Sequence, residues 1–161
     1  MSSFTHVDPQ GGVHMVDISE KADSVRTAVA TGRVHLGPEA FSRVAENTIQ
    51  KGDVLAISQF AGIMGAKETS RLIPLCHQVA LAGIDVELSP DETTHAIEVR
   101  AYAKSVGPTG VEMEALTAVS VSCLTIYDMC KSITKEMVIE NIHLVAKTGG
   151  QSGDYRKPGT E

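Results

Sequence analysis

The chain has 161 residues, of which 42% are hydrophobic and 21% are charged, and these values are typical of one globular domain with its own core. Its formal net charge of −6 argues against broad binding to nucleic acid or to anionic membranes. The amino-terminal sequence has the features of neither a secretion signal nor a transit peptide, and no run approaches the roughly 18 apolar residues of a membrane span, so we expect a soluble cytoplasmic protein.

The first third of the chain predicts an extended arm, a strand and two helices. Residues 1–24 are polar and contain glycine, which is typical of an irregular arm. Residues 25–36 are rich in β-branched side chains that roughly alternate, which indicates a strand. Pro38 marks the start of a short amphipathic helix, and Asp53 is placed to cap a second, mostly apolar helix that reaches about Ser70.

The middle of the chain predicts a tight turn followed by a hairpin. Pro74 stops helix propagation and leaves an apolar segment that ends at His77. Residues 79–88 and 94–106 both alternate between apolar and polar side chains, and the turn-forming residues 89–92 join them. We therefore expect two antiparallel strands.

The longest predicted helix covers residues 110–131. From Ala115 onward this stretch lacks glycine and proline, and apolar residues recur with a 3.6-residue period at Leu116, Val119, Cys123, Ile126, Met129 and Cys130. Such a helix should be mostly buried, yet it carries two carboxylates near its start, Glu112 and Glu114, and a charged pair near its end, Asp128 and Lys131. The first two are compatible with the helix dipole alone, and the charged pair is either a surface ion pair or a proton-transfer pair.

The last third of the chain predicts a strand over 137–146 and a glycine-rich loop over 147–153. Such a loop beside Lys147 can cradle phosphate through backbone N–H groups, although the same composition is common in flexible tails. Residues 155–161 are predicted to be disordered. Long helices combined with antiparallel strands indicate a single α+β domain over 25–154, with helices packed on one face of the sheet.

The three cysteines and His77 predict no tightly bound metal. Cys76, Cys123 and Cys130 include no Cys-x-x-Cys pair, which disfavours both a disulfide framework and a structural zinc site. His77 also lacks a second pair of ligands at zinc-like spacing. We expect reduced cysteines and no metal site.

Several motifs, taken together and in this order, resemble the molybdenum cofactor biosynthesis protein C family. They are HMVDIS at 14–19, KGDV at 51–54, AGIMGAK at 61–67, LIPLCHQ at 72–78, GVEMEALTAVSVSCLTIYDMCK at 110–131 and KTGGQSGD at 147–154. The resemblance runs over nearly the whole chain. It implies a ferredoxin-like fold and a lyase, cyclic pyranopterin monophosphate synthase, which converts 3′,8-cyclo-7,8-dihydroguanosine 5′-triphosphate into cyclic pyranopterin monophosphate and pyrophosphate.

The resemblance also implies roles for individual residues. Asp128 and Lys131 would be the acid/base pair, with Lys51 next in importance. Substrate contacts are implied for Arg26, Leu75, Cys76, His77, Glu112, Met113, Glu114 and Lys147. Without the resemblance, Lys51 is an ordinary solvated loop lysine and His77 is a hydrogen-bonded structural residue. Many relatives carry lysine where this chain has Gln151, so this position is not counted in the site.

Cofactor and partners are likewise implied by the resemblance. The rearrangement needs no tightly bound cofactor, although Mg²⁺ can accompany the triphosphate, and the substrate comes from an upstream radical enzyme that acts on GTP. The family assembles as homohexamers, trimers of dimers, and we expect neither a nucleic-acid nor a membrane partner.

Helix geometry favours a site at the dimer interface. The 14 residues from Glu114 to Asp128 span ~21 Å of helix, which is too far for one substrate to contact both ends easily. Either Glu112 and Glu114 lie on a non-helical entry that folds back, or an antiparallel two-fold pair of helices brings one end of each helix to the opposite end of the other. We favour the second arrangement. Two alternatives to this enzyme remain open: a non-catalytic binding module of the same fold, and a lyase that forms a Schiff base through Lys51 or Lys131.

Overall fold

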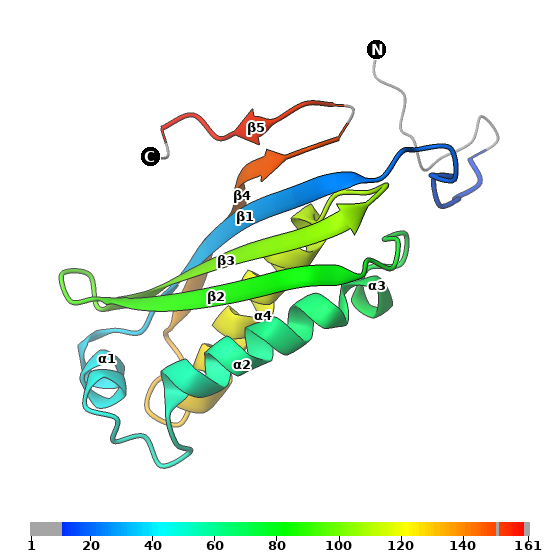
Figure 1. Ribbon diagram of the computed structural model, residues 1–161. Helices are drawn as coiled ribbons and strands as arrows, with labels where there is room; N and C mark the ends of the chain where they lie inside the picture. Colours follow the sequence, from blue (N-terminus) through cyan, green and yellow to red (C-terminus); the bar gives the residue numbers. More distant parts are fainter. Residues whose placement is uncertain (1–10, 151, 160–161) are drawn as a thin grey trace.

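The computed structural model describes residues 11–150 and 152–159. Within them a five-stranded antiparallel sheet of order β2-β3-β1-β4-β5 is covered on one face by two long helices (Figure 1). The elements are β1 (Ser24–His35), α1 (Pro38–Ala45), α2 (Val54–Lys67), α3 (Thr69–Leu72), β2 (Leu81–Asp91), β3 (Ala96–Gly107), α4 (Glu112–Cys130), β4 (Val138–Thr148) and β5 (Tyr155–Arg156). This is the expected α+β, ferredoxin-like fold.

β1 is the central strand, and it carries the face on which α4 packs. It pairs with β3 from Ser24↔Gly107 to His35↔Ala96 and with β4 on its other side. Its alternate residues are fully buried or nearly so, among them Ala28, Ala30 and Val34. These residues belong to a core built largely from aliphatic side chains.

The two long helices approach each other closely because α2 has glycine at the contact. A Cβ atom on Gly62 would lie 2.2 Å from Ser122 Oγ and 3.0 Å from the Ala118 carbonyl oxygen, which real side chains do not tolerate. The Ser122 hydroxyl donates a hydrogen bond to the Ser58 carbonyl at 2.9 Å, which satisfies a buried donor at the same crossing. The side chain of Asp53 caps α2 as expected, accepting from the Ala56 N–H at 2.9 Å. Together these contacts fix the start of α2 relative to α4.

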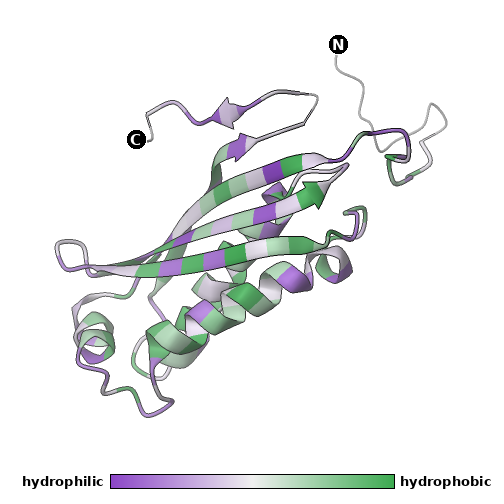
Figure 2. Cartoon of the chain, viewed as in Figure 1, coloured by the Kyte–Doolittle hydropathy of each residue, from purple (hydrophilic) through white to green (hydrophobic). Residues whose placement is uncertain are grey.

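The central helix α4 is a core helix. By length and composition alone it could cross a bilayer, but 56% of its apolar span is buried inside the protein. It lies against β1 and β3 on one side and against α2 on another. Apolar and polar residues alternate along the strands, as the expected one-sided burial requires (Figure 2).

Two boundaries in the middle of the chain differ from the sequence prediction. The second helix ends at Lys67, and the separate short helix α3 follows it. β2 continues through Ser89 and Pro90, which were expected to form the turn, and Pro90 pairs with Ile97. Proline is tolerated there because β2 is an edge strand of the described sheet, where an N–H can face outward without a partner.

The prediction of disorder over 155–161 is wrong at its first two residues. Tyr155 and Arg156 form β5 and pair with Lys147 and Ala146 of β4, and the Lys157 N–H donates to the Val145 carbonyl at 2.8 Å. Residues 160–161, like residues 1–10 of the expected arm and Gln151, lie outside the described residues.

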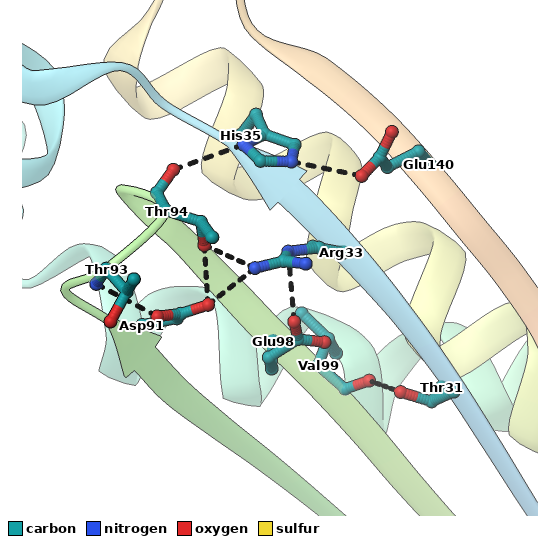
Figure 3. A network of polar contacts seen from close by, with 9 residues as sticks. All are labelled: Thr31, Arg33, His35, Asp91, Thr93, Thr94, Glu98, Val99 and Glu140. Carbon is teal, nitrogen blue, oxygen red and sulfur yellow. Dashed lines mark hydrogen bonds and ion pairs between the residues drawn. The ribbon is translucent and has the colours of Figure 1, made fainter. Parts of the chain in front are cut away.

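A polar network closes the sheet at the end of β1 that lies farthest from the start of α4 (Figure 3). Arg33 Nη2 contacts Asp91 Oδ2 at 2.5 Å and also donates to the Thr94 hydroxyl. On the same strand, His35 Nε2 lies 3.0 Å from Glu140 Oε1 of β4. The network therefore ties β1 to the β2–β3 turn and to β4.

Candidate active site

The candidate residues form two groups at opposite ends of α4. One group surrounds the first turn of the helix at Glu112, and the other surrounds its last turn at Asp128. The 16 residues between these positions correspond to ~24 Å along the helix axis. The two groups are described in turn.

The group at the carboxyl end consists of Asp128, Lys131 and Lys51. Asp128 Oδ1 lies 2.6 Å from Lys131 Nζ, and Oδ2 lies 3.2 Å from Lys51 Nζ. Lys51, from the loop that precedes α2, also donates to the backbone carbonyl of Asp128 at 2.7 Å. The Asp53 cap, two residues further along, holds this loop in place. The three residues that the resemblance names as catalytic therefore lie together, although they come from two distant segments of the chain.

The charges of this group are fixed by its own contacts. Hydrogen bonds from Lys131 and Lys51 hold the pKa of Asp128 below its usual 3.8, and the hydrogen bond to Asp128 raises the pKa of Lys131 above 10.5. At neutral pH the group is a carboxylate between two ammonium ions. It places a proton donor beside a proton acceptor in an exposed position, but both pKa shifts lead away from neutral pH, so an acid/base role requires a bound substrate to change this environment.

At the amino end of α4, a charged cavity of about 290 Å³ is open to solvent. Its cations are Lys21, Arg26 and Lys147, and it is also lined by Thr27, Thr148, Gly149, Gly150, Ser152, Glu112 and residues 108–110. Lys21 was missed by sequence reasoning. In the sequence Lys21 is only one charged residue of the polar arm, and its spacing does not link it to Lys147.

Arg26 and the glycine-rich loop occupy the same place. The Arg26 side chain belongs to a residue that is only 8% exposed, and it donates from Nε to the Gly107 carbonyl at 3.2 Å and from Nη2 to the Pro108 carbonyl at 3.3 Å. A Cβ on Gly150 would lie 2.3 Å from Arg26 Nη1, and Gly149 and Gly150 have φ angles of 79° and 97°. Only glycine allows this backbone to pass so close to the guanidinium.

Lys147 and Glu112 form an ion pair across this cavity. Lys147 Nζ lies 2.9 Å from Glu112 Oε1, with the two side chains 25% and 28% exposed, and it also donates to Ser152 Oγ at 3.2 Å. The Glu112 carboxylate lies directly over Gly110, where a Cβ would be only 1.9 Å from Oε2.

A second, more apolar cavity of about 420 Å³ adjoins the first. Its walls include Ile73, Leu75, Cys76, His77, Val79 and Met113. Thr109, Gly110 and Glu112 line both cavities. Glu112 therefore stands between a charged compartment and an apolar one.

Glu114 is buried next to this second cavity. The residue is 3% exposed, and within the described residues its Oε2 has no hydrogen-bond partner. Burial, and to a smaller extent the charge of Glu112, raises the pKa of Glu114 above 4.5. Burial, followed by the charges of Glu114 and Glu112, raises the pKa of the Cys76 thiol above 9.0, which disfavours its reactive thiolate form at neutral pH.

His77 anchors the amino-terminal arm. Its Nε2 lies 2.7 Å from the Val16 carbonyl oxygen, which can only accept, so Nε2 carries the proton and Nδ1 remains an acceptor when the ring is neutral. A hydrogen-bonded structural role and a place on the cavity wall are therefore both compatible with His77. Among residues 11–150 and 152–159, no three His, Cys, Asp or Glu side chains are grouped so that they could hold a metal ion.

Comparison with known proteins identifies the relatives of this chain. The family model described as the MoaC family matches residues 15–150. The chain is 63% identical over 155 residues to the cyclic pyranopterin monophosphate synthase of Salinibacter ruber, an alignment that covers 96% of this chain and 91% of that protein. It is 55% identical to the protein of the same name from Heliobacterium modesticaldum, covering 96% and 98%. It is also 52% identical to molybdenum cofactor biosynthesis protein 1 of Homo sapiens, but there it spans only 24% of that protein.

Proposed function

The chain belongs to the MoaC family, and from that premise we propose that it is a lyase of molybdenum cofactor biosynthesis, a cyclic pyranopterin monophosphate synthase. It converts 3′,8-cyclo-7,8-dihydroguanosine 5′-triphosphate into cyclic pyranopterin monophosphate and releases pyrophosphate. The observation that carries this proposal is the identity of 63% over 96% of the chain to a protein with that name.

The two adjoining cavities suit the two parts of such a substrate. Lys21, Arg26 and Lys147 offer positive charge to the phosphates. The glycine-rich loop lines the same cavity, although its Gly149 N–H already donates to Asp154 Oδ1 at 3.0 Å. The apolar cavity, with Cys76 and His77 on its wall, suits the flat heterocycle. A triphosphate would bind in the charged cavity either together with Mg²⁺ or through the lysine and arginine side chains alone.

We assign the proton transfers to Asp128 and Lys131, with Lys51 as the third member of the group. No side chain of this group lines either cavity at the other end of α4. The complete site is therefore shared between subunits, so that the last turn of one α4 meets the first turn of its partner across a two-fold axis.

An exposed apolar face on α2 supports assembly with a second copy. Ile57, Phe60 and Met64 are 42%, 66% and 48% exposed at helical spacing, and Leu124 of the neighbouring α4 is 61% exposed. Apolar residues thus continue onto the outer side of α2 (Figure 2). Such a patch is characteristic of an interface between proteins. A homohexamer built as a trimer of dimers is the assembly we propose, in the cytoplasm, with substrate supplied by a radical enzyme that cyclises GTP.

The function is tested by incubating the purified protein with the cyclised GTP derivative and measuring pyrophosphate together with the pterin product by mass spectrometry. Asp128→Asn, which keeps the shape of the side chain, is the control and should lose most turnover. Tight binding without product would favour the non-catalytic binding module. Covalent trapping of substrate by borohydride, lost in Lys51→Ala or Lys131→Ala, would favour the Schiff-base lyase.

A further inference from the structure

The carboxylate of Glu112 pairs with Lys147, one of the cations that line the charged cavity. The Lys147 ammonium has three N–H donors, and two of them are directed to Glu112 Oε1 at 2.9 Å and to Ser152 Oγ at 3.2 Å. An anionic ligand that binds Lys147 would approach Glu112 as a like charge. Because both side chains are mostly shielded from water, solvent would screen this repulsion incompletely.

The Glu112 side chain also has a second cavity within reach. Glu112 lines the apolar cavity as well as the charged one, so a rotation of its side chain is the movement that would carry the carboxylate from one cavity toward the other. Gly110 makes the present position possible, because a Cβ there would lie 1.9 Å from Glu112 Oε2. Glu112 belongs to the first turn of α4, where the helix dipole favours a negative charge.

We propose that Glu112 is an internal competitor for the anion site, displaced from Lys147 by a phosphate group of the ligand and thereby delivered to the apolar cavity. The inference rests on the proposed function for the identity of the ligand. Phosphate binding at Lys147 is then coupled to the release of the Glu112 carboxylate beside the heterocycle. The coupling is reciprocal, so whatever keeps Glu112 on Lys147 weakens phosphate binding by the same factor.

Inorganic pyrophosphate is the probe for this exchange, measured by isothermal titration calorimetry on the full chain. Glu112→Gln removes the competing charge and keeps the shape of the side chain, and it should tighten pyrophosphate binding by about fivefold, the order expected for loss of a partly shielded ion pair. Gly110→Ala forces the carboxylate off its present position and should also tighten binding. Glu92→Gln is the control: it makes the same change of net charge in the β2–β3 turn, at the opposite end of β3, and should leave affinity unchanged.

A double-mutant cycle decides whether the exchange runs through Lys147. In a Lys147→Met background the gain from Glu112→Gln should disappear, because the competitor has lost its partner. Equal or weaker pyrophosphate binding in Glu112→Gln, no binding in any variant, or the same gain in the Lys147→Met background would each overturn the proposal. The turnover assay tests a different claim. If the wild type is active but Glu112→Gln binds pyrophosphate no more tightly, only the exchange at Lys147 is refuted. If Glu112→Gln binds pyrophosphate more tightly but the wild type shows no turnover, only the proposed function is refuted.

Discussion

Subunit complementation tests directly whether the active site is shared. Glu114→Ala disables the amino end of α4 and Asp128→Ala disables its carboxyl end, so each variant alone should be inactive. These ends are ~21 Å apart on one helix, a distance that one substrate cannot bridge. When the two proteins are mixed and allowed to exchange subunits, a mixed dimer contains one site with both ends intact.

The expected recovery follows from counting. Random exchange of equal amounts makes about half of all dimers mixed, and each mixed dimer has one intact site and one site with both ends altered. About a quarter of all sites are then intact, so about 25% of wild-type pyrophosphate release should return. The matched control mixes Glu112→Ala with Glu114→Ala. Both changes affect the amino end, so no combination builds an intact site.

Native mass spectrometry of a tagged and an untagged variant establishes that mixed oligomers have formed. Turnover that stays at the level of the parent proteins, despite such mixing, would place each site within one chain and refute the shared site. Equal recovery in the control mixture would refute it as well.

Four further results are expected. Asp128→Asn should lower turnover by about 10²–10⁴-fold without changing Tm, because its ion pairs are exposed. Gly62→Ala should destabilise the protein by about 1–3 kcal/mol in urea denaturation, because its Cβ would strike α4, whereas Gly83→Ala, with nothing within 4 Å, should not. Burial raises the pKa of Glu114 above 4.5, so the native state keeps a proton that the unfolded chain loses, and stability falls as pH rises through this window. Glu114→Gln removes this titration. The Tm of the variant should therefore exceed that of the wild type by more at neutral pH than at acidic pH. Iodoacetamide should label Cys76 faster than the other two cysteines in the native protein, because Cys76 is only partly buried whereas Cys123 and Cys130 are fully buried.

The sequence was sufficient for the order of the longer elements and for their packing on one face, but not for the short elements α3 and β5. Periodicity identified α4 because its buried positions recur with the period of a helix, and alternation identified the β2–β3 hairpin. The end of β2 was misplaced because Pro90 favours a turn locally, whereas its edge position in the sheet, a tertiary property, allows it to stay in the strand. β5 was missed because two residues are too few to show a period.

The candidate site was only partly predictable for a similar reason. Motifs named its residues, but pairing between distant segments cannot be read from spacing. Lys147 is 35 positions from Glu112 in the sequence and 2.9 Å from it in space, and Lys51 reaches Asp128 from a separate loop. Only the fold shows that Glu112 faces two cavities at once.

The helix α4 also sets the distance between its two ends, and its length is therefore constrained. It contains no glycine or proline between Glu112 and Cys130, so it has no place to bend or to absorb a change. One residue inserted within it would lengthen it by ~1.5 Å and turn its two ends relative to each other by ~100°, which would misalign the two halves of the shared site that we propose. A longer or shorter β2–β3 turn carries no such penalty. Among homologous sequences, insertions and deletions should therefore be found in that turn and not in α4.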